Sequence, residues 1–325
     1  MCGICGEIRF DGTSADVSAV DTMTCEMTRR GPDANGLYAK GSVALGHRRL
    51  KIIDLSERGS QPMVDPDLGL ALVFNGCIYN HRELRAELEG KGYRFFSHAD
   101  SEVILKAFHA WGKNCVDHLL GMFAFAVVET DSGTVTLARD RLGIKPLYLA
   151  ERPGRLRFAS SPQALLRAGE VDTTIDRVAL HHYFSFHAVV PAPHTIYNGI
   201  RKLPPATVRT ITPDGRSTEF RYWTPAFEPH PDRAEWDEKR WQHELIDSLR
   251  TSVKRRMVAD VPVGVLLSGG VDSSLVVALL AEQGQTDLAT FSIGFDSAGG
   301  EAGDEYAYSD VIADTFATDH HKIHI

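Results

Sequence analysis

The N-terminus of this chain, Met1-Cys2-Gly3-Ile4, combines two groups that can act together in catalysis. If Met1 is removed, Cys2 carries a thiol nucleophile and a free α-amine on one residue. An α-amine titrates near ~7.7–8.0 and a thiol near ~8.5, so at neutral pH the amine can help to deprotonate the thiol or an attacking water. A cysteine at position two is a weak signal by itself, and the rest of the chain must supply the other groups of a site.

A second candidate site is Ser268-Gly-Gly-Val-Asp-Ser-Ser274, which joins a short apolar strand predicted at 263–267 to a helix predicted at 275–282. Its glycines let backbone N–H groups converge on an anion, and the helix N-terminus adds positive potential, so pyrophosphate is the expected ligand. The motif has neither the lysine of a Walker loop nor the three glycines of a dinucleotide fingerprint. Asp272 is suited to hold Mg²⁺ beside the phosphates, because that ion prefers oxygen ligands.

Composition narrows the class of protein. The chain has 325 residues, of which 43% are hydrophobic and 24% charged, as in an ordinary globular protein of two domains. Its net charge of -8 argues against nucleic acid or an anionic membrane as the main partner. No apolar run approaches the ~20 residues of a membrane helix, and no secretory signal is visible. The five scattered cysteines favour reduced thiols and therefore a cytoplasmic protein.

The elements that must position Cys2 lie in residues 1–222, which are rich in strands and contain a few separate helices. We predict a strand pair within 43–54, a buried strand at 70–74 that enters a turn at Asn75-Gly76, and a helix at 101–111 capped by Asp100. Further strands are expected at 7–10, 122–129, 134–139, 147–150 and 156–159, and further helices at 17–27 and 82–89. This order predicts an α+β fold in which stacked antiparallel sheets are covered by helices.

The elements that must position the glycine turn have a different order. Residues 223–236 are rich in proline and are expected to form a linker. From 237 to 325 helices and short apolar strands alternate, which predicts the beginning of a parallel α/β domain. Its three strands are too few for a well-covered sheet, and we expect that the rest of this domain is not represented.

Several further motifs accompany Cys2 and the glycine turn, and together, in this order, they resemble the glutamine-dependent asparagine synthetase family. The motifs are Met1-Cys-Gly-Ile-Cys-Gly6, Arg30-Gly-Pro-Asp33, His47-Arg-Arg-Leu50, Phe74-Asn-Gly-Cys-Ile-Tyr-Asn80, Gly121-Met-Phe-Ala-Phe125, Ala138-Arg-Asp-Arg-Leu-Gly-Ile-Lys-Pro-Leu-Tyr148 and Ser268-Gly-Gly-Val-Asp-Ser-Ser274. The resemblance implies a class II glutaminase domain with the sandwich fold of N-terminal-nucleophile hydrolases. It also implies an ATP-pyrophosphatase domain that activates a carboxylate.

The resemblance assigns roles to individual residues. Cys2 matches the thiol that attacks the glutamine side-chain amide, and Asn75 with the Gly76 N–H matches the oxyanion hole. Arg49 matches the group that binds the α-carboxylate, and Asp100 the group that receives the α-ammonium. The remaining residues expected around glutamine are Leu50, Ile52, Ile53 and Cys77. Those expected around ATP and pyrophosphate are Leu267, Ser268, Gly269, Gly270, Asp272, Ser273, Ser274 and Ile293.

Two positions depart from the family pattern. Cys77 stands where the family usually has Glu, which removes one anionic partner for the substrate ammonium. Ser161 also stands where Glu is usual, and nothing in the sequence explains that change. The Asn-Gly-Cys variant resembles a subgroup that amidates N-acetylglutaminylglutamine, so the acceptor remains open between aspartate and that compound.

The implied function is an ATP-dependent ligase. Cys2 releases ammonia from glutamine, ATP adenylates an acceptor carboxylate, and ammonia forms the amide with release of AMP and pyrophosphate. One alternative resembles β-lactam synthetase, in which the glutaminase domain is silent. Another is a non-enzymatic module that binds zinc through Cys2 and Cys5. The sequence is compatible with a homodimer but does not predict the oligomeric state.

Overall fold

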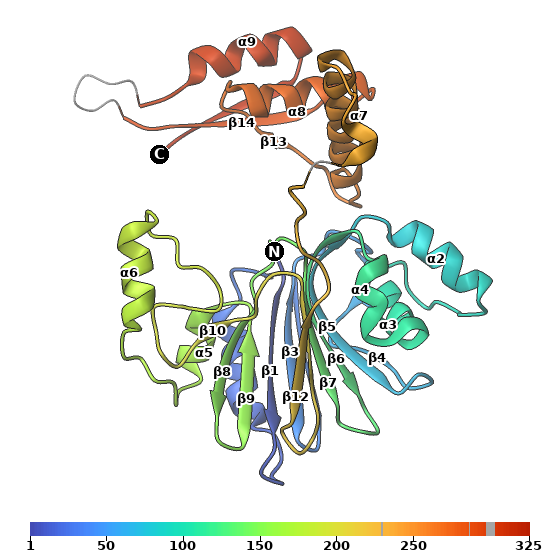
Figure 1. Ribbon diagram of the computed structural model, residues 1–325, viewed down its shortest axis with the longest axis vertical. Helices are drawn as coiled ribbons and strands as arrows, with labels where there is room; N and C mark the ends of the chain where they lie inside the picture. The colour runs from blue at the N-terminus through green and yellow to red at the C-terminus, as the bar shows by residue number, and fades with distance from the viewer. Residues whose placement is uncertain (229, 286, 297–302) are drawn as a thin grey trace. The chain divides into compact units, whose positions relative to one another are not determined.

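The computed structural model describes residues 1–228, 230–285, 287–296 and 303–325 (Figure 1). The chain divides into two compact units, Met1–Ala226 and Phe227–Ile325. Each unit has its own hydrophobic core, and each is described here by itself.

Two six-stranded antiparallel sheets form the centre of the first unit. In spatial order the first sheet contains β10 (Arg201–Lys202), β8 (Tyr148–Arg152), β9 (Arg155–Ala159), β1 (Gly3–Arg9), β3 (Val43–Arg49) and β2 (Ala34–Lys40). The second contains β12 (Ser217–Arg221), β11 (Thr207–Ile211), β7 (Val135–Arg139), β6 (Gly121–Glu129), β5 (Leu70–Ile78) and β4 (Met63–Asp65). The strand β1, which follows Cys2 directly, lies between β9 and β3 and is paired on both sides.

The two sheets pack face to face, and helices cover both outer faces (Figure 1). Ile4 and Leu45 of the first sheet share one buried cluster with Val73 and Ala126 of the second. Helices α1 (Val17–Glu26) and α5 (Pro162–Arg167) pack on the first sheet, and α2 (His81–Gly90) and α3 (Asp100–Trp111) pack on the second. This four-layer arrangement confirms the predicted α+β sandwich. The smaller elements of this unit are η1 (Glu57–Gly59), η2 (Gly112–Asn114), α4 (Cys115–His118) and α6 (Arg177–Ser185).

Three local predictions in the first unit were wrong. Asn75 and Gly76 do not form a turn, because β5 continues to Ile78 and pairs with β6 along its whole length. The predicted strand pair within 43–54 is a single strand, β3, whose partner β2 lies earlier in the chain. Helix α3 begins at Asp100 itself, and its N-cap is Ala99.

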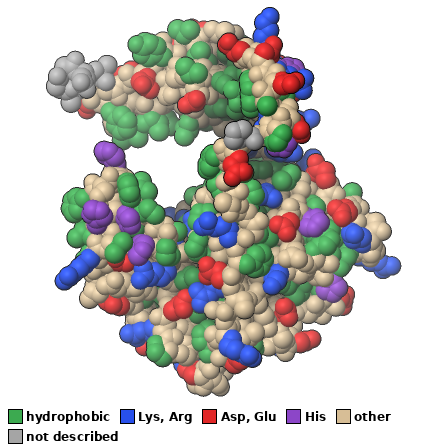
Figure 2. Space-filling view, viewed as in Figure 1, with side chains coloured by type: hydrophobic (Ala, Val, Ile, Leu, Met, Phe, Trp, Pro, Cys, Tyr) green, Lys and Arg blue, Asp and Glu red, His purple; other side chains and the backbone are tan. Residues whose placement is uncertain are grey.

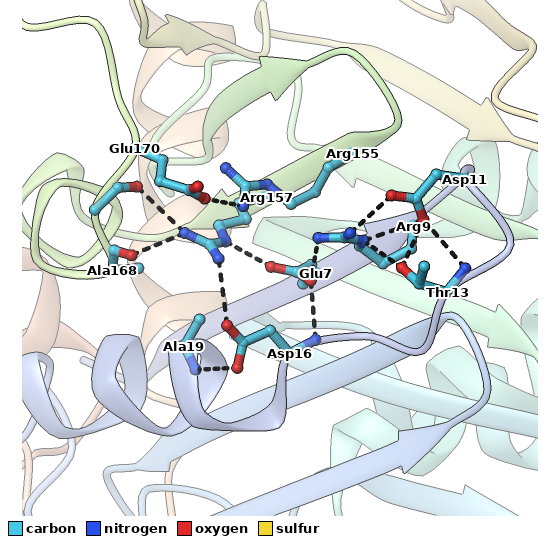
Figure 3. A network of polar contacts seen from close by, with 11 residues as sticks. Glu7, Arg9, Asp11, Thr13, Asp16, Ala19, Arg155, Arg157, Ala168 and Glu170 are labelled. Atoms are coloured by element: carbon cyan, nitrogen blue, oxygen red, sulfur yellow. Dashed lines mark hydrogen bonds and ion pairs between the residues drawn. The ribbon is translucent and has the colours of Figure 1, made fainter.

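A buried ion network ties helices α1 and α5 to the first sheet (Figure 3). Arg157 on β9 donates from Nε to Oε2 of Glu7, its register partner on β1, at 2.6 Å. The other oxygen of the Glu7 carboxylate accepts from the backbone N–H of Asp16, at the start of α1, at 2.9 Å. Arg157 also donates to the carbonyl of Ala168, just after α5, at 2.9 Å. Both charged side chains are buried, so their mutual contacts replace solvent and hold β1 in place.

The second unit contains a three-stranded parallel sheet, β13 (Val265–Leu266), β14 (Ala289–Gly294) and β15 (Asp319–His324), with β14 in the middle. Its helices are α7 (Glu238–Arg256), α8 (Val271–Glu282) and α9 (Tyr306–Phe316), and η3 (Pro231–Arg233) precedes them. Leu267, Val277, Leu280 and Ala313 form the centre of its core. The alternation of helices with parallel strands confirms the predicted α/β order.

Exposed apolar side chains gather with histidines around α6 (Figure 2). Phe184 is 77% exposed, and the other exposed apolar residues of this segment are Val178, Leu180, Tyr183, Phe186 and Val189. Among the described residues, no helix has both the length and the apolar character needed to cross a membrane.

The ion network generates a prediction about stability. Glu7→Gln should lower the free energy of unfolding of the first unit by roughly 3–5 kcal/mol, because it removes the close, fully buried charge partner of Arg157 and leaves only the partly exposed Asp16 at 3.9 Å. Urea titration would measure the loss. The matched control is Glu87→Gln, which removes an exposed ion pair with Lys91 and should change stability by less than about 0.5 kcal/mol. Equal midpoints for the two variants would contradict the role given to this network.

Candidate functional site

A cavity of about 270 Å³ opens in the first unit beside the start of β1. That volume lies near the lower end of ligand sites, which run from about 300 to 1,000 Å³, and suits a ligand of amino-acid size. Every residue that the resemblance assigns to glutamine lines it, although these residues come from both sheets and from α3. The lining residues are Met1, Cys2, Arg49, Leu50, Ile52, Ile53, Gly59, Gln61, Phe74, Asn75, Gly76, Cys77, Ala99, Asp100, Ser101, Met122 and Lys145.

The Cys2 thiol is held at the wall of this cavity by the backbone of Leu50, just after β3. Its Sγ accepts from the Leu50 N–H at 3.3 Å and lies 3.6 Å from the Leu50 carbonyl, to which it can donate. Arg30 donates from Nε to the carbonyl of Cys2 at 3.1 Å, which fixes the peptide after the thiol. Burial raises the pKa of the thiol, so the group is protonated at neutral pH and needs a base.

The α-amine in this structure belongs to Met1, and burial lowers its pKa. A lowered pKa increases the unprotonated fraction of the amine near neutral pH, which is the state required of a base. The Met1 side chain also lines the cavity, where its Sδ accepts from Lys145 Nζ at 3.1 Å. Removal of Met1 would transfer the amine to Cys2 and free this part of the cavity.

The unpaired edge of β5 supplies the opposite wall. Strand β4 pairs with β5 only at Leu70–Leu72, so beyond Leu72 this edge has no neighbouring strand. In an antiparallel ladder the N–H and C=O of one residue point to the same side, and that side alternates along the strand. Phe74 and Ile78 both bond on this free edge, Phe74 with Gln61 and Ile78 with Asp100. The N–H of Gly76, midway between them, must point the same way and therefore toward the cavity.

Glycine is required at position 76 by crowding, not by backbone conformation. A Cβ there would lie 2.2 Å from the carbonyl oxygen of Met122 on the neighbouring strand. The side-chain Nδ2 of the adjacent Asn75 is buried and has no hydrogen-bond partner among the described residues. A buried amide donor without a partner is costly, so a ligand oxygen that accepts from it would be stabilised. One backbone donor and one side-chain donor are thus available to a developing negative charge.

Arg49 ends β3 and turns its guanidinium into the loop that follows. It donates from Nη1 to the carbonyl of Ser56 at 2.8 Å and from Nη2 to the carbonyl of Asp54. Gly59 makes room for it, since a Cβ at Gly59 would lie 2.3 Å from Nη2. A guanidinium has five N–H donors, so this buried cation keeps donors for a carboxylate in the cavity.

Asp100 provides the anion of the cavity. Its carboxylate accepts from the Ile78 N–H at 2.9 Å. Burial raises its pKa to about 6, so the carboxylate is ionised at neutral pH although its environment disfavours the charge. An ammonium group would relieve that cost, which makes this position suited to a substrate amine.

Sequence reasoning gave no role to several residues that line the cavity. Lys145 is buried there, and burial lowers the pKa of its ammonium. Its motif, Gly-Ile-Lys-Pro, entered the resemblance but carried no assigned function. Gln61 was missed because its contact with β5 depends on the ends of two strands, which no sequence pattern marks. Cys77 was expected here, and burial raises the pKa of its thiol to about 12, so it adds no charge.

Cys5 does not join Cys2 in one ligand set. Its Sγ lies 3.3 Å from Thr24 Oγ1 and 3.7 Å from the carbonyl of Val20, within the core beneath α1. Burial raises its pKa to about 12, whereas a zinc ligand must be a thiolate. This geometry disfavours the zinc module considered from the sequence.

The second unit places the glycine turn at the carboxyl end of β13. A cavity of about 270 Å³ there brings together three of the residues predicted to bind nucleotide, Leu267, Ser268 and Ile293. Its other lining residues are Leu266, Phe291, Ser292, Glu305 and Tyr306. The remaining predicted residues, Gly269, Gly270, Asp272, Ser273 and Ser274, do not line this cavity but follow in the turn and the first turn of α8.

The turn itself has features that suit a phosphate. Gly269 has φ +81°, and a Cβ there would lie 2.5 Å from the Cβ of Tyr308, so only glycine fits. Gly270 is the N-cap of α8 and offers no side-chain acceptor to the first N–H groups of the helix. The hydroxyl of Ser274 is buried and has no hydrogen-bond partner among the described residues. An anion at this helix N-terminus would satisfy these donors.

Comparison with known proteins identifies the fold and then the family. The glutamine phosphoribosylpyrophosphate amidotransferase of B. subtilis superposes with a TM-score of 0.55 at 16% identity, covering 99% of this chain and 90% of that one. The model of the glutamine amidotransferase domain family matches residues 1–223, and the asparagine synthase model matches residues 244–325. The chain therefore belongs to the glutamine amidotransferase domain family, as its motifs predicted.

Curated relatives carry both regions. Asparagine synthetase [glutamine-hydrolyzing] 3 of Bacillus subtilis is 32% identical over 340 residues, which is 99% of this chain and 54% of the relative. Asparagine synthetase [glutamine-hydrolyzing] 1 of the same organism is 38% identical over 302 residues, 92% of this chain and 46% of the relative. The chain thus spans about half the length of these relatives.

The raised pKa of Asp100 generates a prediction about stability. Because the folded pKa, about 6, exceeds the unfolded value of about 3.9, folding favours the protonated acid, and this contribution is lost as the pH rises through 6. Asp100→Asn should therefore raise the free energy of unfolding by roughly 1–3 kcal/mol at pH ~7.5 and change it little at pH ~4. Urea titration at both pH values measures this, with exposed Asp67→Asn as control. A variant no more stable than wild type at the higher pH would show that burial does not destabilise the ionised form of Asp100.

Proposed function

We propose that this chain releases ammonia from glutamine in its first unit and belongs to a glutamine-hydrolysing asparagine synthetase. The observation that carries the proposal is that one cavity unites five groups: a thiol at Cys2, a side-chain amide at Asn75, a backbone N–H at Gly76, a guanidinium at Arg49 and a carboxylate at Asp100. This set matches the polar groups of glutamine one by one. Arg49 binds the α-carboxylate, Asp100 binds the α-ammonium, and the side-chain amide lies at the thiol.

The chemical step follows from the groups at Cys2. Once Met1 is removed, the α-amine of Cys2 takes the thiol proton, and the thiolate attacks the amide carbon of glutamine. The oxygen that becomes negative accepts from Asn75 Nδ2 and the Gly76 N–H. The C–N bond then breaks, and the leaving nitrogen takes the proton from the amine and departs as ammonia. Water, deprotonated by the same amine, hydrolyses the thioester and releases glutamate.

The second unit is proposed to bind ATP. The N-terminal end of α8, with Ser268, Gly269, Gly270, Ser273 and Ser274, would bind the pyrophosphate portion. Leu267 and Ile293 would contact the nucleoside. Asp272, which is exposed in the first turn of α8, would hold Mg²⁺ together with phosphate oxygens, and the ion would neutralise phosphate charge. Among the described residues no group of three or more His, Cys, Asp or Glu side chains could bind a metal by itself, and phosphate oxygens and waters would supply the other ligands.

Aspartate is the proposed acceptor, because the named relatives are asparagine synthetases. N-acetylglutaminylglutamine is the second candidate, and only Cys77 supports it.

We propose a glutaminase domain at 1–222, a linker at 223–236 and a synthetase region at 237–325. A homodimer and a cytoplasmic location stay predictions from the sequence.

Substitution of the nucleophile tests the proposal. Cys2→Ala should abolish glutamate release from glutamine, with a loss of at least about a thousandfold, because Cys77, the other cysteine that lines the cavity, has a pKa raised to about 12 and no α-amine of its own to deprotonate it. Where amide synthesis can be assayed, synthesis from ammonia should survive in the same variant. Cys25→Ala, which changes an exposed cysteine on α1, is the control and should retain activity.

Two outcomes would refute it. Full glutaminase activity in Cys2→Ala would exclude the thioester, and a wild-type chain of verified N-terminal mass that releases no glutamate would instead support the silent-domain alternative.

Replacement of Cys77 tests the substrate contacts. Cys77→Glu should strengthen glutamine binding on the order of 1–3 kcal/mol, because a carboxylate beside Asp100 adds a second partner for the substrate ammonium. The measurement is KM for glutamine, with Cys77→Gln as a control of equal size and no charge. If KM is the same in both variants, the ammonium does not lie at position 77.

A further inference from the structure

A buried histidine links the two sheets close to the cavity. His47 lies on β3, two residues before Arg49, and its side chain is fully buried. Its Nε2 lies 3.1 Å from the carbonyl oxygen of Phe74, which is on β5 of the other sheet and directly precedes Asn75. The hydrogen bond therefore connects the strand that ends in Arg49 to the strand that carries the orphan donors.

The Phe74 peptide groups are held by side chains because no strand reaches them. The ladder between β4 and β5 ends at the pair Met63–Leu72, so Phe74 lies two residues beyond the last backbone partner. Gln61, which continues the register of β4, accepts the Phe74 N–H with Oε1 at 2.7 Å. His47 contacts the carbonyl of the same residue from across the interface between the sheets. Both polar groups of Phe74 are thus fixed on the edge to which the Gly76 N–H also points.

The protonation state of His47 follows from its surroundings. A carbonyl oxygen can only accept, so Nε2 carries the proton of this bond. Burial, together with a smaller effect of nearby Arg49, lowers the pKa of the imidazole to about 3, so the ring is neutral at working pH. Nδ1 is then unprotonated, and it has no hydrogen-bond partner among the described residues. The imidazole is a fixed neutral donor and cannot serve as the base of the reaction.

We propose that His47 is a positioning residue that aligns the oxyanion-binding donors of β5 through its hydrogen bond to Phe74. The inference rests on the proposed glutaminase function and deepens it. Without this bond Phe74 keeps only the contact of its N–H with Gln61 among the described residues, and its buried carbonyl loses its donor. Asn75 and Gly76 would then lose alignment toward an oxygen that becomes charged only in the transition state.

Kinetics of three variants of the full chain test this role. His47→Leu should lower kcat for glutamate release by at least about tenfold, a fraction of the roughly 10²–10³ that loss of a whole oxyanion donor costs. KM for glutamine should stay within about twofold, because Arg49 and Asp100 still bind the substrate. His47→Gln, whose amide can donate to the same carbonyl, should recover most of kcat. Leu45→Ala is the control, since Leu45 lies on the same face of β3 and packs in the inter-sheet core without a polar contact.

The outcomes separate the role from simple destabilisation. A loss of kcat in Leu45→Ala equal to that in His47→Leu, or a rise of KM with no change in kcat, would overturn the proposal. If His47→Leu does not fold, ¹⁵N NMR of the histidines in the wild-type chain decides. A ring protonated at Nε2 and unchanged between about pH 5 and pH 8 supports the proposal, and a ring that titrates there or is protonated at Nδ1 refutes it. A wild-type chain without glutaminase activity refutes the proposed function, while the NMR result still reports on the hydrogen bond.

Discussion

The early end of the β4–β5 ladder is the constraint on which the candidate site depends. Beyond Leu72 the edge of β5 has no strand beside it, and its outward backbone groups must find other partners. The N–H and carbonyl of Phe74 bond with Gln61 and His47. The N–H of Ile78 bonds with Asp100, and the Gly76 N–H faces the cavity. A longer β4 would satisfy these backbone groups and leave no backbone donor of β5 for a ligand. The site therefore exists because the sheet is incomplete at this point.

Burial around the cavity disfavours the charged forms of several groups that line it. Burial raises the pKa of the Cys2 thiol and of Asp100, and it lowers the pKa of the N-terminal amine and of Lys145. Each shift disfavours the charged form, as expected where water is scarce. A protonated thiol beside an amine of lowered pKa is the pair from which proton transfer can begin. The same environment strengthens every contact made to a charged substrate.

The sequence predicted the layers of the first unit because its central strands are buried on both faces and read as apolar runs, as in 122–129. It did not predict β2, whose sequence from Ala34 to Lys40 includes Asn and Gly and lies at the edge of the sheet with alternating exposure. The prediction of a turn at Asn75-Gly76 was wrong because Asn-Gly pairs are common in turns, whereas here glycine is needed because the carbonyl of Met122 leaves no room for a Cβ.

Motifs located the predicted site residues well, since all of those assigned to glutamine line one cavity. They could not supply the partners that hold these residues. The bonds from His47 and Gln61 to Phe74 depend on where two strands stop and on the packing of one sheet against another. Such contacts join positions distant in sequence and leave no local pattern. The same holds for Lys145, which reaches the cavity from the loop between β7 and β8.

The contact between Lys145 and Met1 gives maturation of the N-terminus an electrostatic consequence. While Met1 is attached, its thioether lines the cavity and accepts the hydrogen bond of the buried Lys145 ammonium. Removal of Met1 would leave the Lys145 ammonium without this acceptor and would also make the amine of Cys2 the N-terminus. Removal of this one residue would therefore both enlarge the cavity and make its electrostatic potential more positive, which favours a ligand that carries a carboxylate.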